Sequence, residues 1–181
     1  MFNYPMYTGI YDFSLANAVK ILIENQDGKI LLVQEPENFE WMPLHWGLPG
    51  GKATKTESLL ETLDRKIKGD IGHEININGI VSIEEILMKE RTVQMFIVSA
   101  KTDSNNIQGD VKVYKWVTKE DVEKMNRENF TEFYNKRLLL DYFNNKLPKP
   151  IPLSIIHTGE HYKLENDPEY KKWFESGSKK N

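Results

Sequence analysis

The chain has 181 residues, which suits one domain with extensions and is long enough to bury a hydrophobic core. Its net charge of −3, from 24 basic and 27 acidic residues, argues against a general binder of nucleic acid or anionic membranes, which needs a basic face. The absence of cysteine excludes disulfides, thiol catalysis and cysteine-ligated zinc. No signal-peptide pattern and no apolar run of the roughly 18 residues that a membrane span needs is present, so we expect a cytoplasmic protein.

The first 14 residues carry five aromatic side chains among turn-forming residues, namely Phe2, Tyr4, Tyr7, Tyr11 and Phe13. Large aromatic side chains near a chain terminus can tie it down by covering apolar surface. We therefore interpret residues 1–14 as an aromatic arm that packs on the domain or on a second subunit. The alternative is an aromatic wall over the base of a substrate.

A β-hairpin is predicted next. Apolar residues alternate within Leu15–Glu24, as they do along a strand. Residues 25–28 have the sequence Asn-Gln-Asp-Gly, which carries the Asp-Gly turn signal, and Lys29–Gln34 is the returning strand. A loop over residues 35–45 then leads into the stretch with the strongest signals in the chain.

That stretch, Trp46–His73, predicts a glycine turn, a short loop and an amphipathic helix. Because Gly50 and Gly51 lack a Cβ atom, the backbone there can turn tightly and approach a ligand closely. The sequence Ser-Leu-Leu-Glu from Ser58 has the pattern of a capping box, which predicts Ser58 as the N-cap. The apolar stripe of the helix follows at helical spacing, at Leu59, Leu60, Leu63 and Ile67.

The second half of the chain returns to strands and then to helices. We expect short apolar strand segments within Ile75–Met88, strands at Thr92–Lys101 and Val111–Val117, a short helix from an N-cap at Thr118 to about Met125, and a longer amphipathic helix over Asn129–Lys146. Residues 148–181 are a proline-rich extension that we expect to pack on the domain or on a partner subunit. A homodimer is expected on this basis.

The Trp46–His73 stretch resembles the Nudix box, the signature of enzymes that hydrolyse nucleoside diphosphates linked to another group. The pattern falls on Gly51, Glu57, Arg65, Ile67 and Gly72 without an insertion, and the sequence Trp-Gly-Leu-Pro-Gly-Gly before it matches the family's usual lead-in. The resemblance extends from about residue 15 to residue 145, and we expect the domain to span residues 15–147. It implies the α/β/α sandwich of that family, an α/β (α+β) fold with a mixed β-sheet.

The resemblance also implies a hydrolase that binds a small nucleotide-type molecule and uses Mg²⁺ or Mn²⁺. It assigns catalysis to Glu57, Arg65 and Asp70, of which Glu57 and Asp70 would also hold the metal ion. We expect the substrate to contact Trp46, Gly50, Gly51 and Lys66. Trp41 and Trp46 are additionally candidates for stacking on a base, with packing as the alternative.

The box departs from the family pattern where the family has glutamates, because this chain has Lys66, Gly69 and Asp70 instead. Mg²⁺ prefers several oxygen ligands, and carboxylates three or four residues apart converge on one face of a helix. Gly69 supplies no ligand. Lys66 is four residues from Asp70, so the two side chains can pair and neutralise the one carboxylate left in that row.

Three interpretations remain open on the sequence alone. In the first, the protein is a working pyrophosphohydrolase with a weakened or altered metal site. In the second, it is catalytically inactive and binds a nucleotide or nucleotide-sugar-type ligand as a sensor, with Lys66 replacing the metal ion as the counter-ion of phosphate. In the third, the fold serves only as an interaction scaffold.

Other polar residues are weaker candidates. Carboxylates that could be recruited to the site are Glu84, Glu85, Glu90, Asp103 and Asp110. The segment from His157 to His161 spells H-x-x-E-H, a zinc-hydrolase pattern that requires a helix. Because Gly159 lies inside it and Pro152 shortly before it, we interpret the two histidines as surface or packing residues.

Overall fold

The structure, a computed structural model, describes residues 14–39, 42–54, 57–87 and 91–156, together with residues 168 and 172. Four of the expectations above therefore lie outside the described residues. They concern the aromatic arm up to residue 13, Trp41, Glu90 and the H-x-x-E-H pattern of residues 157–161.

The described residues form a mixed seven-stranded sheet with the order β3-β2-β1-β6-β5, in which β4 also pairs with β1 and β7 with β2. Strands β1 and β6 run parallel, and the other pairs are antiparallel. The expected fold class with a mixed sheet is confirmed. The strands are β1 (Ser14–Glu24), β2 (Ile30–Gln34), β3 (Trp46–Gly47), β4 (Gly50–Lys52), β5 (Asn76–Leu87), β6 (Arg91–Lys101) and β7 (Tyr114–Val117).

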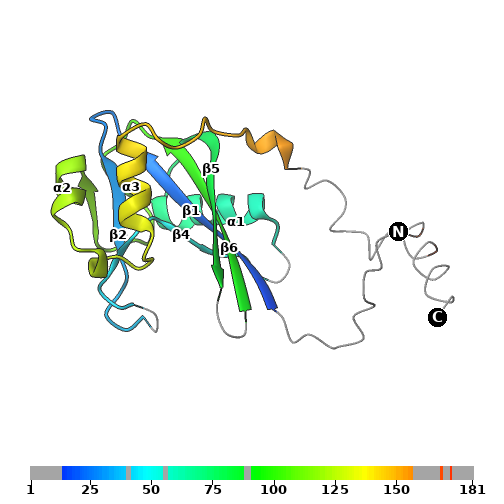
Figure 1. The fold of residues 1–181 in the computed structure, drawn as a ribbon. Coiled ribbons are helices and arrows are strands. Elements are labelled where there is room, and N and C mark those ends of the chain that lie inside the picture. Colours follow the sequence, from blue (N-terminus) through cyan, green and yellow to red (C-terminus); the bar gives the residue numbers. More distant parts are fainter. Residues whose placement is uncertain are drawn as a thin grey trace, which may run out of the picture.

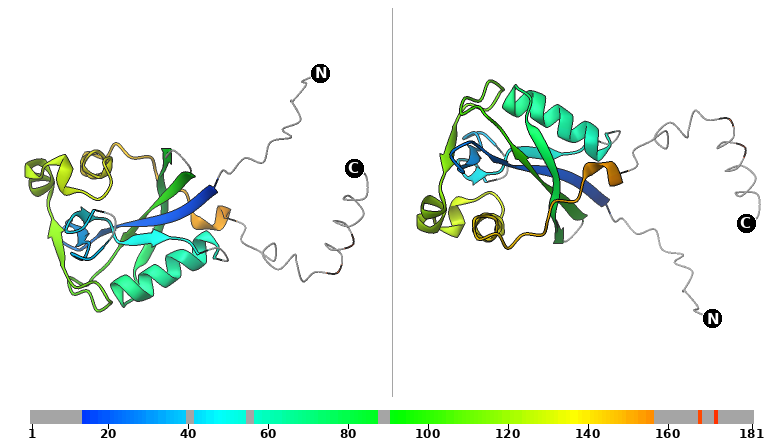
Figure 2. Two further views of the ribbon diagram at one scale, coloured as in Figure 1. Left: turned by 90° about the horizontal axis from the view of Figure 1, so that it is seen from below. Right: turned by 90° about the horizontal axis from the view of Figure 1, so that it is seen from above.

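Helices cover both faces of the sheet (Figures 1 and 2). Helix α1 (Leu59–Lys66), which continues as the π-helical segment η1 (Ile67–Ile71), lies on one face. Helices α2 (Lys119–Lys124) and α3 (Asn135–Phe143) lie on the other. Short 3₁₀ turns, η2 (Arg127–Asn129) and η3 (Leu153–Ile155), complete the set.

The hydrophobic core is divided by strand β1, whose side chains are buried on both faces. Ala18 packs in the cluster that includes Leu139 of α3, whereas Val19 and Ile21 pack in the cluster that includes Leu63 of α1. Alternating side chains of a strand point to opposite faces, so a central strand covered by helices on both sides must be apolar at nearly every position. The one charged residue in the middle of β1, Lys20, is therefore conspicuous, and it is also buried.

The hairpin of the first two strands forms as predicted, and Gly28 in its turn has a φ of +72°. Two predictions about later elements are wrong. The short segments predicted within Ile75–Met88 are instead one long strand, β5 (Asn76–Leu87), whose register shifts near Gly79 make the sequence pattern look interrupted. The strand predicted over Val111–Val117 is shorter, because β7 covers only Tyr114–Val117.

The long helix predicted over Asn129–Lys146 is also wrong at its beginning, since α3 starts at Asn135. The segment before it is held in a different conformation by the edge of the sheet. Phe130 forms a bridge with Trp46, and the backbone N–H of Thr131 donates to the carbonyl oxygen of Trp46 at 2.9 Å. Phe133, which lies in the first part of the predicted helix, is 69 % exposed.

The start of the C-terminal extension packs on the edge of the domain. Ile151 and Ile80 exchange two backbone hydrogen bonds of 2.8 and 2.9 Å, which continue the sheet beyond β5. A Cβ atom at Gly79 would lie 2.3 Å from the carbonyl oxygen of Ile151, so this close contact requires glycine. In the part of the chain that is described, no helix has the length and apolar character to cross a membrane.

Candidate functional site

The glycine turn brings the backbone of β4 against both β1 and the end of α1. Gly50 has a φ of +138°, and a Cβ atom there would lie 2.1 Å from the carbonyl oxygen of Val19. A Cβ atom at Gly51 would lie 2.6 Å from Cε of Lys66, so the side chain of Lys66 crosses directly over this residue. Glycine is needed at Gly50 by the backbone, whereas a side chain at Gly51 would displace the end of Lys66.

Helix α1 begins as the sequence predicts. The hydroxyl of Ser58 accepts from the backbone N–H of Glu61 at 3.1 Å, and the carboxylate of Glu61 accepts from the backbone N–H of Ser58 at 2.8 Å. This capping box fixes the point at which the loop enters the helix. Within the predicted apolar stripe Leu63 is buried, and the other three residues are half-buried.

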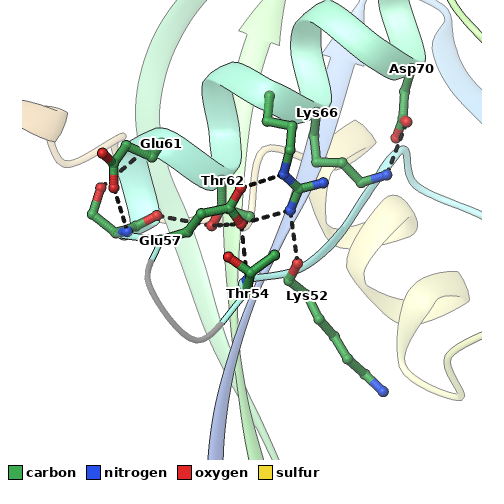
Figure 3. A network of polar contacts seen from close by, with 9 residues as sticks. Lys52, Thr54, Glu57, Glu61, Thr62, Lys66 and Asp70 are labelled. Atoms are coloured by element: carbon green, nitrogen blue, oxygen red, sulfur yellow. Dashed lines mark hydrogen bonds and ion pairs between the residues drawn. The ribbon is translucent and has the colours of Figure 1, made fainter.

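Glu57, in the loop before α1, is held by Arg65 across two turns of the helix (Figure 3). Its Oε1 lies 2.5 Å from Nε of Arg65, and its Oε2 accepts from Nη2 of Arg65 at 2.8 Å and from the backbone N–H of Thr54 at 2.9 Å. Arg65 also donates to the carbonyl oxygen of Lys52 at 3.1 Å. The hydrogen bonds from Arg65 and Thr54 lower the pKa of Glu57 to about 2.

Lys66 and Asp70 form the ion pair that their spacing predicts (Figure 3). Nζ of Lys66 lies 2.9 Å from Oδ1 of Asp70, while the other carboxylate oxygen accepts from the backbone N–H of Gly50 at 3.2 Å. Asp70 lies in η1, and π-helical turns often occur at functional sites. The two side chains are 22 % and 18 % exposed, so the pair is partly shielded from water while Lys66 stays accessible.

The residues at this point do not fit a divalent metal ion bound in the manner that the resemblance implies. Mg²⁺ and Mn²⁺ need several oxygen ligands that no cation already occupies. The carboxylate of Glu57 is held by Arg65, and that of Asp70 is held by Lys66. Among the described residues, no group of three or more His, Cys, Asp or Glu side chains could hold a metal ion.

Trp46, expected to contact the substrate, lies in β3 and packs half-buried against the core on the α3 side of the sheet. Nζ of Lys115 lies 4.0 Å from its ring centroid, a cation–π contact. Of the recruitable carboxylates, Glu84 pairs with Arg137, and Glu85, Asp103 and Asp110 are exposed. The backbone N–H of Asp110 donates to the carbonyl oxygen of Gly69 at 2.7 Å, so this loop lies next to Asp70. Among the described residues, none of the four carboxylates has a hydrogen bond or ion pair with the side chain of Asp70 or Lys66.

Sequence analysis missed a second charged group beside the same turn. Lys20 is 9 % exposed in its side chain, and its Nζ lies 3.0 Å from Oε1 of Glu132 and 3.3 Å from the carbonyl oxygen of Leu48. Glu132 also accepts from the amide of Asn135 at 2.7 Å and from the hydroxyl of Thr131. Burial by itself raises the pKa of Glu132, but the charge of Lys20 and these hydrogen bonds bring this pKa below its ordinary value.

Glu35, the residue after β2, is half-buried. Burial raises its pKa, and the charges of Lys20, Glu132, Lys66 and Asp70 all act on it. One signal could have revealed this cluster. Lys20 alternates with apolar residues at an inward position of a central strand, where a buried cation requires an anionic partner.

Comparisons with known proteins agree with the fold described above. The sequence model of the NUDIX domain matches residues 14–138. No curated protein matches the chain.

Solved structures with a similar fold include a MutT protein from Methanosarcina mazei Go1, which is 23 % identical over 73 % of this chain and 94 % of its own, with a TM-score of 0.60. A NUDIX hydrolase from Nitrosomonas europaea is 19 % identical over 80 % of this chain and 97 % of its own, with a TM-score of 0.63. A NUDIX-family hydrolase from Clostridium perfringens is 18 % identical over 73 % and 98 %, with a TM-score of 0.56. At these identities the likeness is one of fold.

Proposed function

Because the chain belongs to the Nudix family, we propose that it hydrolyses the pyrophosphate bond of a substrate in which a nucleoside diphosphate is linked to another group. The site combines the glycine turn, Glu57, Arg65, Lys66 and Asp70, and its use of metal is weakened or altered. No step of the proposed reaction uses Mg²⁺ or Mn²⁺, since the carboxylates that would bind these ions are paired with Arg65 and Lys66. The proposed location is the cytoplasm, with residues 15–147 as the catalytic domain.

One observation carries the proposal, namely that Asp70 bonds to the backbone N–H of Gly50 at 3.2 Å. This hydrogen bond holds Asp70 at the glycine turn, which is where we expect the substrate to bind. Pyrophosphate hydrolysis needs a positioned water molecule and positive charge near the phosphate oxygens. Asp70 and Lys66 provide one group of each kind, 2.9 Å apart.

In the proposed step Asp70 accepts a proton from water, and the water oxygen forms a bond to phosphorus. The bond from phosphorus to the bridging oxygen breaks, and the leaving phosphate takes the electron pair. The ammonium group of Lys66 stabilises the charge that builds up on the phosphate oxygens. Glu57 and Arg65 act on the loop before α1, which they hold through Thr54 and Lys52.

A second function is favoured by the Lys66–Asp70 pair itself, because both carboxylate oxygens of Asp70 already have partners, one in Lys66 and one in the backbone N–H of Gly50. In this alternative the protein binds a nucleotide or nucleotide-sugar-type ligand without turnover, as a sensor or scaffold. We further propose a homodimer in which the N-terminal arm and the C-terminal extension take part. Sedimentation analysis at several protein concentrations tests this assembly.

The test of function is ³¹P NMR of the full chain with ADP-ribose, a nucleoside triphosphate and a dinucleoside polyphosphate. The proposal predicts slow conversion of at least one of them to phosphate monoesters. Glu57→Gln and Asp70→Asn should abolish this conversion. Asp64→Asn is the matched control, because Asp64 lies on the same helix with its side chain 61 % exposed and pairs only with exposed Lys68. Ligand-dependent chemical shifts without products would favour the sensor.

A further inference from the structure

The ion pair between Lys20 and Glu132 lies beside the glycine turn but on the opposite face of the sheet from Lys66. Lys20 and Gly50 are paired in the register of β1 and β4, and Nζ of Lys20 bonds to the carbonyl oxygen of Leu48, just before the turn. Lys20 points to the α3 side, as do its neighbours Ala18 and Leu22. The turn is therefore flanked by two ammonium groups, one from β1 and one from α1.

A contribution to the stability of the fold is a weak explanation for a buried Lys20–Glu132 ion pair. Both side chains are close to nine-tenths buried, at 9 % and 12 % exposure. Removing two charges from water costs much of what their attraction returns, and apolar residues of similar volume often serve as well in such a place. Charged groups buried next to a ligand-binding turn are more typical of a functional site.

Two ion pairs thus lie beside the same turn, Lys20 with Glu132 and Lys66 with Asp70. Together they contain two ammonium groups and two carboxylates. In a metal site the positive charge among such carboxylates would come from the ion.

The two lysines differ in what they can offer a ligand. Lys20 is buried, and Leu48 and Glu132 take two of its three N–H donors. Lys66 is more exposed, and among the described residues Asp70 is its hydrogen-bond acceptor, which leaves two donors for another partner. Lys20 therefore balances the buried carboxylate of Glu132, and Lys66 is the group that a phosphate can reach.

We infer that Lys20 and Lys66 are built-in cations of this site, and that it binds the diphosphate group of a ligand without a divalent metal ion. Phosphate oxygens bond to Lys66 in exchange for Asp70, while Lys20 stays paired with Glu132. This inference rests on the proposed function only in taking a diphosphate as the ligand group. It adds Lys20 and Glu132 to the site.

The test is calorimetric titration of the full chain with inorganic pyrophosphate in the presence of EDTA. Wild-type protein should bind, and added Mg²⁺ should not strengthen binding. Lys66→Met should weaken it about tenfold, since a charge-assisted hydrogen bond is lost. Lys68→Met is the matched control, two residues away and exposed, and should bind like wild type.

The role of Lys20 needs a variant that leaves no unpaired buried charge. In Lys20→Met with Glu132→Gln both charges are removed, and the glutamine can still accept from Thr131 and Asn135. We expect several-fold weaker binding of pyrophosphate and an unchanged circular dichroism spectrum. Unchanged affinity in this folded double variant would contradict the part assigned to Lys20.

Binding of pyrophosphate only when Mg²⁺ is present, or equal affinities of Lys66→Met and Lys68→Met, overturns the inference. The same experiments distinguish this inference from the proposed hydrolase activity. Metal-free binding without turnover of any substrate would leave the inference standing and remove the hydrolase. Turnover that strictly requires Mg²⁺, in a protein that does not bind metal-free pyrophosphate, would leave the hydrolase standing and remove the inference.

Discussion

Lys66 holds the carboxylate of Asp70 at 2.9 Å, and the same side chain passes over Gly51, where a Cβ atom would lie 2.6 Å from its Cε atom. The pair thus connects the last part of the helix to the glycine turn. Among the described residues, a lysine and an aspartate make this connection.

Replacing Asp70 separates the two roles proposed for it. In Asp70→Asn the ammonium group of Lys66 loses its anionic competitor, so metal-free pyrophosphate should bind several-fold more tightly in calorimetry. Turnover measured by ³¹P NMR should fall at the same time, because the base is lost. Asp64→Asn removes an exposed carboxylate from the same helix and should change neither quantity. Weaker binding in Asp70→Asn would mean that Asp70 itself contacts the ligand as an acceptor.

Gly69 offers a stability test that does not depend on function. A Cβ atom there meets no heavy atom within 4 Å, and the residue is in a helical segment. Gly69→Ala should raise the free energy of unfolding by about 0.5–1 kcal/mol, the helical advantage of alanine. Urea denaturation measures it.

Gly72 is the contrasting position in the same segment. It ends the helix with a φ of +79°, and a Cβ atom would lie 2.4 Å from the backbone nitrogen of Gly109. Gly72→Ala should therefore lower the free energy of unfolding, by roughly 1–3 kcal/mol for a strained left-handed residue. Equal stabilities of the two alanine variants would contradict this account of the helix end.

Much of the fold follows from local patterns in the sequence. The hairpin signal Asp27-Gly28 and the capping boxes at Ser58 and Thr118 depend on neighbouring residues, and the structure contains all three. The Lys66–Asp70 pair is also local, because one helical turn separates its members. Short-range chemistry of this kind can be predicted without knowing the fold.

The other features of the fold and of the site depend on contacts between residues that are distant in sequence. Lys20 and Glu132 are 112 positions apart and meet only because the segment before α3 packs against the edge of the sheet. The same packing holds residues 130–134 out of the helix that their apolar spacing predicts. The second ion pair and the wrong helix start therefore share one cause, a tertiary contact that outweighs local preference.

Glu57 predicts a loss of stability in acid. Arg65 and Thr54 lower its pKa from 4.5 to about 2, so the folded state binds fewer protons than the unfolded state between these values. The contribution of Glu57 to the free energy of unfolding is complete above pH 4.5 and is lost as the pH falls toward 2. Glu57→Gln should be less stable than wild type at pH 7, and the difference should disappear near pH 2. Urea denaturation at several pH values measures it, and a difference that does not depend on pH would contradict the assignment.

For Glu35 we predict the opposite dependence of stability on pH. Because burial raises its pKa, the folded state keeps a proton that the unfolded state releases, and stability falls as the pH rises above 4.5. Glu35→Gln should remove this fall and be more stable than wild type at pH 7. Glu37→Gln, at an exposed position of the same loop, is the control and should follow wild type.

The most direct test of the central claim, that lysines have replaced metal ions in this site, is Mn²⁺ binding followed by electron paramagnetic resonance. Wild-type protein should leave Mn²⁺ free in solution. Lys66→Glu removes the cation next to Asp70 and adds a carboxylate one turn away, so this variant should bind Mn²⁺, whereas the exposed Lys68→Glu should not. Binding of Mn²⁺ by wild type as tightly as by Lys66→Glu would contradict the claim.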